Sequence, residues 1–126
     1  MESIIDRVFN IISTNNILGL RTLLEDGLDP NITGFYNNET ALMIATTYGH
    51  IDIVRLLLEY NADPNTTDDE GETALAMATS LNVLDNEDII KTLLEYNTDP
   101  NTQNYDGYTP LMKASIDSYI NIVDDK

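Results

Sequence analysis

Residues 40–65 read TALMIATTYGHIDIVRLLLEYNADPN, and this stretch determines the fold. Thr40 is a suitable N-cap, because its hydroxyl can accept hydrogen bonds from backbone N–H groups one turn further on. Gly49 can take the left-handed conformation that ends a helix. A second helix is predicted over residues 51–60, where apolar residues recur at the spacing of one buried face: Ile53, Val54, Leu57 and Leu58. Two short helices are therefore expected, followed by a turn-rich loop from about Asn61.

The same landmarks recur along the chain at a nearly constant interval. Asp-Pro-Asn occurs at residues 29–31, 63–65 and 99–101, which are 34 and 36 residues apart. Each copy follows a Leu-Leu-Glu and precedes a Thr-x-Leu. A unit of two short helices and a loop cannot bury its apolar face alone, so it has to stack on copies of itself. The repeat predicts an all-α array without a β-sheet core.

These landmarks resemble the ankyrin repeat, a family with a period of 33 residues and a T-P-L-H-x-A signature. The fourth unit keeps the signature most closely, as Thr109-Pro110-Leu111 followed by Ala114. The resemblance covers essentially the whole chain and implies an ankyrin-repeat solenoid of stacked helix-turn-helix units with protruding loops. It implies one domain, residues 1–126, divided into an N-terminal capping repeat and three further repeats: 1–31, 32–65, 66–101 and 102–126.

Several units depart from the family pattern. The capping repeat keeps only the second half of the motif, from residue 17 to residue 31, and Asn38 stands where the family prefers glycine. In the third unit, three residues are inserted and Leu81 to Asn86 replace the Gly-His turn. We expect this insertion to protrude between the two helices of its unit.

The C-terminal end is expected to leave the array incompletely covered. The second helix of the fourth unit has only begun at Ile120, Ile122 and Val123 when the sequence ends at Lys126. A helix this short is marginal in water, so the apolar surface around Ile90, Leu93 and Leu94 would lack a complete cover. We expect either fraying after about Ser118 or self-association through this end.

The chain is strongly acidic, with six Lys and Arg against 22 Asp and Glu, and a net charge of −16 over 126 residues. Such a surface repels nucleic-acid phosphates and anionic lipids and attracts cationic partners. We therefore expect neither direct nucleic-acid binding nor membrane association, although the charge could also serve solubility alone. No apolar run is long enough to span a membrane, and residues 1–13 do not form a secretory signal. A cytoplasmic location is expected.

The residue types needed for catalysis or cofactor binding are nearly absent. There is no cysteine, and His50 is the only histidine; the resemblance gives it a hydrogen bond across the inter-helix turn. Metal sites need several such ligands, and the six glycines are too scattered for a phosphate-binding loop. The loop carboxylates at residues 68–70, 72 and 106 are expected to be solvated, hence not general acids or bases. We expect no enzyme activity, no metal and no cofactor.

The resemblance implies that partners bind the concave face, which consists of the loop tips and the first helix of each unit. The matching positions are rich in tyrosine, which offers a large rigid contact area, and in acids, and they contain no base. The expected binding residues are Tyr36, Glu39, Tyr48, Asp69, Glu70, Glu72, Leu81, Tyr105, Asp106, Tyr108 and Asp117. These residues predict a partner protein with a basic surface; the alternative is a structural segment of a longer ankyrin array.

The basic residues are expected on the opposite, outer surface. Arg21, Arg55 and Lys91 occupy equivalent positions in three second helices, and each precedes a glutamate by four residues. Pairs at this spacing lie on one helix face and are worth a few tenths of a kcal/mol each, roughly. They predict an outer surface that is partly neutralised and an inner surface that keeps the negative charge.

Two further features depend on composition and on the resemblance. Asn31, Asn65 and Asn101 match the position that an asparaginyl hydroxylase modifies in ankyrin repeats; hydrogen bonding between adjacent loops is the role we favour for them. The abundance of Asn and Ile is typical of AT-rich genomes, such as those of large DNA viruses and intracellular bacteria. Such an origin would place the protein in a host cytoplasm or nucleus.

Overall fold

The computed structural model describes residues 2–79 and 86–112. Within these ranges the chain is helical and contains no strand. The elements in chain order are α1 (Ile4–Ser13), α2 (Ile17–Glu25), the short 3₁₀ helix η1 (Tyr36–Asn38), α3 (Ala41–Thr47), α4 (Ile51–Glu59), α5 (Ala74–Ala78) and α6 (Asn86–Glu95). The expectation of an all-α fold is confirmed.

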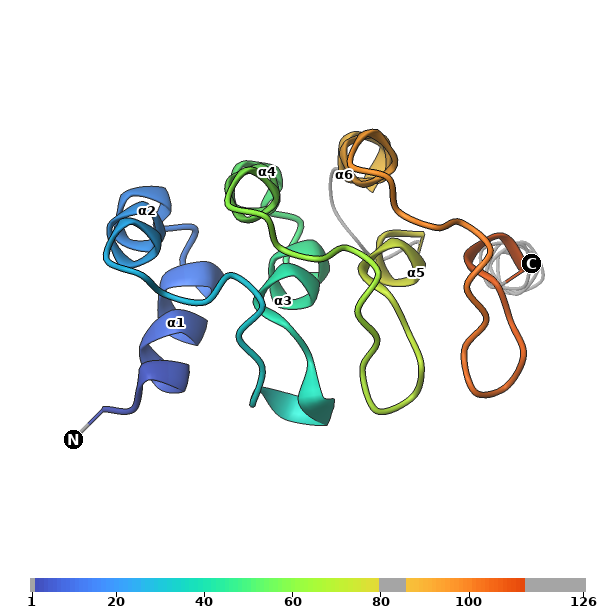
Figure 1. Ribbon diagram of the computed structural model, residues 1–126, viewed down its shortest axis with the longest axis horizontal. Coiled ribbons are helices and arrows are strands. Elements are labelled where there is room, and N and C mark those ends of the chain that lie inside the picture. The colour runs from blue at the N-terminus through green and yellow to red at the C-terminus, as the bar shows by residue number, and fades with distance from the viewer. Residues whose placement is uncertain (1, 80–85, 113–126) are drawn as a thin grey trace, which may run out of the picture.

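The helices are arranged as three antiparallel pairs that stack side by side (Figure 1). The first helices of the pairs, α1, α3 and α5, form one row, and α2, α4 and α6 form a second row above it. The loops that precede α3, α5 and the segment at 110–112 extend away from both rows, below the first helices. The molecule is thus an elongated array with the loops along one edge.

The helix boundaries follow from local chemistry. Thr40 and Thr73 cap α3 and α5, since each side chain accepts a hydrogen bond of 3.2 Å from the backbone N–H three residues on. Gly49 has a φ of 73° at the turn between α3 and α4, and Asn61 has a φ of 70° just beyond α4. Left-handed backbone at these positions ends each helix and turns the chain.

The first unit contains a complete helix pair, although its sequence keeps only the second half of the family motif. α1 lacks the Thr-x-Leu signature, but Ser3 caps it by accepting from the Asp6 N–H at 3.1 Å. Val8 and Ile12, one turn apart, are fully buried. An apolar stripe at helical spacing was sufficient to build this helix without the family signature.

One continuous hydrophobic core runs through the array. Every side chain of α3 from Ala41 to Thr46 is buried, because α3 packs against α1, α4 and α5. Each second helix contributes its apolar face; Ile53 and Leu57 of α4, and Ile89 and Leu93 of α6, are fully buried. The core therefore passes without interruption from one unit to the next, as a stacked repeat requires.

Several sequence expectations lie outside the described residues. They are the protrusion of the insertion, the candidate binding residues Leu81 and Asp117, and the fraying of the C-terminal end after Ser118. Asn86, expected to be the last residue of the inserted turn, is the first residue of α6.

Candidate protein-binding face

Backbone hydrogen bonds join the tips of three consecutive loops. The Asp69 N–H donates to the Asn37 carbonyl at 3.0 Å, and the Tyr105 N–H donates to the Glu70 carbonyl at 3.1 Å. We call residues 36–39, 68–72 and 104–108 the loop-tip strip. The hydrogen bonds give the strip a defined geometry that crosses three units.

Two side chains organise the individual tips. Asp68 Oδ1 accepts from the backbone N–H groups of residues 70 and 72, each at 2.9 Å. Asn104 Oδ1 does the same for residues 106 and 108, again at 2.9 Å. Each tip then turns at a glycine with positive φ, Gly71 (80°) or Gly107 (84°). Sequence reasoning missed this role, although an Asx residue three positions before a glycine in both loops was a visible signal.

Two of the loop carboxylates are buried, which corrects the expectation that all of them are solvated. Asp68 is 5% exposed and Glu72 is 6% exposed. Asp68 also accepts from the Asn37 amide at 3.2 Å, and Glu72 accepts from the Asn104 amide of the next loop. Both carboxylates therefore hold neighbouring loops together, and Glu72 is removed from the candidate contact residues.

Three of the other acidic candidates lie at the surface. The side chains of Asp69, Glu70 and Asp106 are exposed. Glu70 also accepts from the Asn37 amide at 3.2 Å, which fixes its carboxylate beside the preceding loop. These three carboxylates follow the loop-tip strip over two adjacent units.

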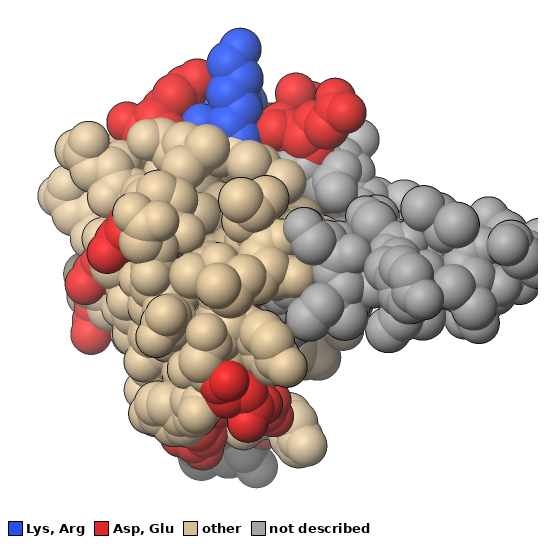
Figure 2. Space-filling model, turned by 90° about the vertical axis from the view of Figure 1, so that its right-hand side faces the viewer, with Lys and Arg blue, Asp and Glu red and all other residues tan. Residues whose placement is uncertain are grey.

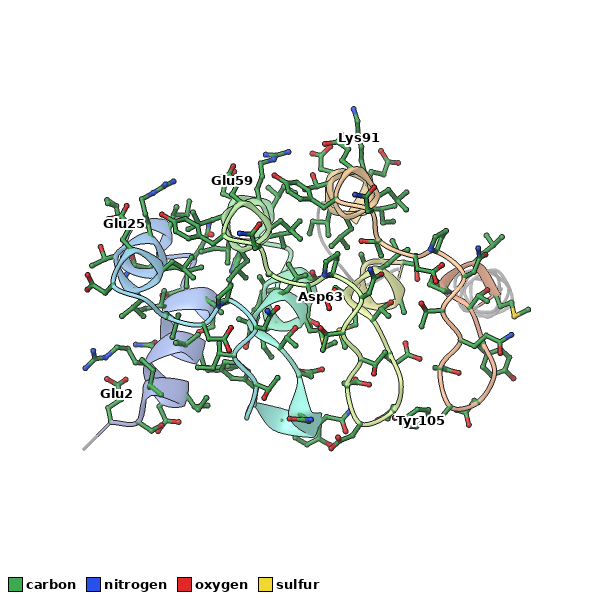
Figure 3. The ribbon with its side chains drawn as sticks, in the orientation of Figure 1. Glu2, Glu25, Glu59, Asp63, Lys91 and Tyr105 are labelled. Carbon is green, nitrogen blue, oxygen red and sulfur yellow. The ribbon has the colours of Figure 1, made fainter. Side chains whose placement is uncertain are left out.

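The tyrosine candidates are exposed as well. Tyr36 is 86% exposed and Tyr105 is 76% exposed, and Tyr48 and Tyr108 are exposed to a smaller extent. Gly71 leaves room for Tyr105, because a Cβ at Gly71 would lie 2.8 Å from the Tyr105 ring. The ring thus lies against the preceding loop (Figure 3), at the glycine that directly follows the exposed Asp69 and Glu70.

Glu39 is a half-buried carboxylate between the loops. Burial raises the pKa of Glu39 above its ordinary value of 4.5, and the negative charges of Asp68 and Glu70 raise it further. The folded protein therefore binds a proton at Glu39 more tightly than the unfolded chain does. In the ionised form, Glu39 adds unneutralised negative charge to the loop-tip strip.

We expect Glu39→Gln to stabilise the protein at pH 7 by several tenths of a kcal/mol, roughly, because it removes this charge. A carboxyl group whose pKa is higher in the folded state stabilises the fold at pH values below its pKa in the unfolded chain. This contribution is lost as the pH rises through its pKa in the folded protein. The advantage of the variant should therefore shrink as the pH falls toward 4.5 and below. Urea unfolding of both proteins across this range measures it, and an advantage independent of pH would contradict the argument.

Arg21, Arg55 and Lys91 lie on the second-helix row, as expected, whereas Arg7 lies on α1. Lys91 points away from the loops, on the side of the array where Glu25 and Glu59 also lie (Figure 3). From the C-terminal side, basic side chains gather at that upper edge with acids beside them, whereas the lower edge carries acids without bases (Figure 2). The loop-tip strip and the outer surface thus differ in charge.

The predicted ion pairs along the second helices are not formed. Between described residues, the ion pair present is Arg7 Nε to Glu2 Oε2 at 3.8 Å. Arg55 instead donates to the Thr92 hydroxyl of the next unit at 3.4 Å. Fixing two long, solvated side chains in one geometry costs rotamer entropy that a surface ion pair barely offsets.

His50 links two units, which corrects its expected hydrogen bond across the turn. Its Nε2 lies 3.3 Å from the Ser13 carbonyl at the end of α1, and its ring stacks on Tyr48 with centroids 5.9 Å apart. The Phe9 ring contacts the Tyr48 ring edge to face, with the two ring centroids 6.1 Å apart. In the described part of the chain, no cluster of His, Cys, Asp and Glu could hold a metal ion.

The recurrence of the Asp-Pro-Asn motif has a structural explanation. Asn31 Oδ1 accepts from the Asp63 N–H, and Asn65 Oδ1 accepts from the Asp99 N–H, each at 2.7 Å. The expected hydrogen bonds between adjacent loops are confirmed for both residues. Each asparagine therefore fixes the distance from its own loop to the next.

Comparison with known proteins agrees with this architecture. The family model described as "Ankyrin repeats (3 copies)" matches residues 9–104 and 60–124. An ankyrin repeat protein of fowlpox virus (strain NVSL) is 39% identical over 61 residues, 48% of this chain and 8% of the relative. One of Acanthamoeba polyphaga mimivirus is 35% identical over 72 residues, 57% of this chain and 44% of the relative.

A third relative carries the repeat in a different setting. The palmitoyltransferase AKR1 of Lachancea kluyveri is 39% identical over 74 residues, which is 57% of this chain and 10% of that enzyme. The chain thus spans less than half the length of each of these three relatives. Among the described residues, no helix is long and apolar enough to cross a membrane. From the matching repeats and the stacked helix pairs, the chain belongs to the ankyrin-repeat family.

Proposed function

We propose that this chain is a non-enzymatic interaction module that binds a basic protein surface through its loop-tip strip. Ankyrin repeats in general mediate protein–protein interaction and are not catalytic. The palmitoyltransferase among the relatives is mostly composed of sequence that this chain does not match. The proposal therefore concerns which surface binds and what kind of partner it selects.

The observation that supports this choice most directly is the composition of the strip. Apart from Asn38, its exposed side chains are carboxylates and tyrosines, and the loops at residues 31–40, 61–73 and 96–109 contain no Lys or Arg. Carboxylates fixed on joined loops attract a cationic partner and speed its association. Exposed tyrosines can bury large area with little loss of rotamer freedom.

The same charge argument excludes some partner classes from the proposal. A surface of this sign repels phosphate groups, so we propose a protein partner and neither nucleic acid nor an anionic membrane surface. The viral relatives suggest an intracellular setting, and we propose a cytoplasmic location, in a host cytoplasm or nucleus if the chain is viral.

Charge reversal tests the proposal. We expect Asp69→Lys combined with Asp106→Lys to weaken binding of a captured basic partner at least tenfold, about 1.4 kcal/mol. Both side chains are exposed, so the melting temperature should stay nearly unchanged. Pull-down at low and high salt, followed by titration of the captured protein, provides the measurement.

The control changes the same amount of charge on the other side of the array. Glu25→Lys combined with Glu59→Lys alters the second-helix row, where both glutamates are exposed. Equal losses of binding for the two double variants would mean that only net charge matters, and the assignment to the loop-tip strip would be wrong.

The alternative is a structural segment of a longer ankyrin array without its own partner. The fowlpox relative supports this alternative, because the sequence that matches this chain makes up 8% of that longer protein. The two functions separate in the same pull-down. A partner captured in a salt-sensitive way supports the interaction module, and no partner at either salt concentration supports the structural segment.

A second candidate contact is self-association near the C-terminal end. A cavity of about 240 Å³ lies between α5, α6 and residues 110–111. The described residues that line it carry no charge: Leu75, Thr79, Ile90, Leu94, Pro100, Pro110 and Leu111. Leu94 and Leu111 are exposed. We propose that a second copy covers this apolar surface. Sedimentation should then show a dimer that Leu111→Gln dissociates, and a wild-type monomer at every concentration would refute it.

A further inference from the structure

The first-helix row has a different chemistry from the loops beside it. α3 (ALMIATT) and α5 (ALAMA) contain no charged residue at all. Their exposed or half-buried positions include Thr47, Tyr48 at the α3 C-cap and Met77 of α5. The earlier expectation of negative charge over the whole inner surface therefore applies to the loops and not to these two helices.

Contacts between partly exposed side chains connect α1, α3 and α5 across three units. Phe9 of α1 is 40% exposed and contacts Tyr48 edge to face. The residue before Tyr48, Thr47, directs its hydroxyl at the Met77 sulfur of α5, at 3.9 Å. We call Phe9, Thr47, Tyr48 and Met77 the apolar strip. Sequence reasoning found Tyr48 but missed Phe9, because its first unit lacks the family signature.

The two strips lie at opposite ends of the first helices. Glu39 precedes the α3 N-cap and Tyr48 follows its last helical residue. The seven residues of α3 span roughly 10 Å at 1.5 Å per residue. The acidic end is incompletely neutralised, since burial and the charges of Asp68 and Glu70 raise the pKa of Glu39. A cation delivered there relieves repulsion that the free protein carries.

We propose that the partner segment is an amphipathic basic helix, which lays apolar side chains on the apolar strip and its Lys and Arg along the loop-tip strip. An α-helix with its side chains is about 10–12 Å across, which is close to the length of α3 between Glu39 and Tyr48. Such a helix presents an apolar stripe and a charged stripe side by side, as helix-in-groove complexes do. This inference rests on the proposed function and adds the class of partner.

Two synthetic peptides of identical Leu and Lys composition, each about five helical turns long, test it. One repeats leucine with helical periodicity, and the other alternates leucine and lysine with strand periodicity. We expect the first to bind at least tenfold more tightly and to gain helical circular dichroism on binding. Equal binding of both peptides, or tighter binding of the alternating peptide, would overturn the proposal in favour of charge alone or an extended partner.

Variants of the apolar strip make the test sharper. Thr47→Glu adds a carboxylate at an exposed position. If binding is purely electrostatic, this variant should bind a basic peptide more tightly. If the peptide makes an apolar contact there, the variant should bind it more weakly. Phe9→Gln should also weaken the helical peptide, while the control Leu18→Gln, on the 71% exposed Leu18 of α2, should not. Tighter binding by Thr47→Glu would overturn the proposal.

If the loop-tip strip does not bind a basic partner at all, the same experiments should give a different pattern of results. If neither peptide binds, or if Asp69→Lys with Asp106→Lys leaves binding of the helical peptide intact, the loop-tip strip is not the binding surface. If that double variant weakens both peptides equally and Phe9→Gln weakens neither, the acidic function stands and the amphipathic helix is wrong.

Discussion

Replacing Leu57 by alanine is expected to lower the free energy of unfolding by about 3 kcal/mol, within the 2–5 kcal/mol usual for buried leucines. Leu57 is fully buried in α4, and α4 packs against α2, α3 and α6. Truncation therefore removes apolar burial and leaves a cavity at a helix that joins three units. At the few degrees per kcal/mol usual for this size, the melting temperature should fall by about 10 °C.

The matched control is Leu18→Ala, because Leu18 is an exposed leucine of α2. This change should alter the unfolding free energy by less than about 0.5 kcal/mol. Urea unfolding of both variants gives the two values under one set of conditions. If Leu57→Ala were as mild as Leu18→Ala, α4 would not lie at the centre of a continuous core.

Replacing Asp68 by alanine should cost about 2 kcal/mol, although Asp68 belongs to a surface loop. Its carboxylate accepts from the backbone N–H groups of Glu70 and Glu72 and from the Asn37 amide. Removing it leaves buried donors without acceptors and disconnects two loops. Asp68→Asn should cost less, because the amide oxygen still accepts, as Asn104 does in the next loop.

Asp69→Ala provides the comparison for this loop. Asp69 is the next residue, and its side chain is exposed. We expect a change of less than about 0.5 kcal/mol in thermal or urea unfolding. If the two alanine variants lost equal stability, the buried hydrogen bonds of Asp68 would have no special role in the loop.

The helices were predictable from the sequence because their signals are local. Thr40 and Thr73 cap helices with their own side chains, and Gly49 and Asn61 adopt left-handed backbone that few other residues tolerate. The repeat then supplied the stacking, since each unit exposes an apolar face that only a neighbour can cover. α1 lacks the family signature, so the repeat motif gives weaker support for it than for α3 and α5.

The loop carboxylates were not predictable in the same way. Asp68 and Asp69 are identical in type and adjacent in sequence, yet one is buried and the other exposed. The difference arises from the neighbouring loop, whose Asn37 contacts Asp68 from 31 residues away. Burial of Glu72 likewise depends on Asn104, from the loop that follows. Contacts between units determine which carboxylates stay exposed to a partner. The sequence of a single unit therefore cannot predict it.

The central claim is that the loop-tip strip, and not the second-helix row, receives a basic partner. Backbone amide shifts in ¹H–¹⁵N spectra test it most directly when the protein is titrated with the helical Leu–Lys peptide. The account predicts the largest changes at Asp69, Glu70 and Tyr105, with small changes at Arg21, Arg55 and Lys91. Changes concentrated on α2, α4 and α6, or spread evenly over the whole array, would contradict it.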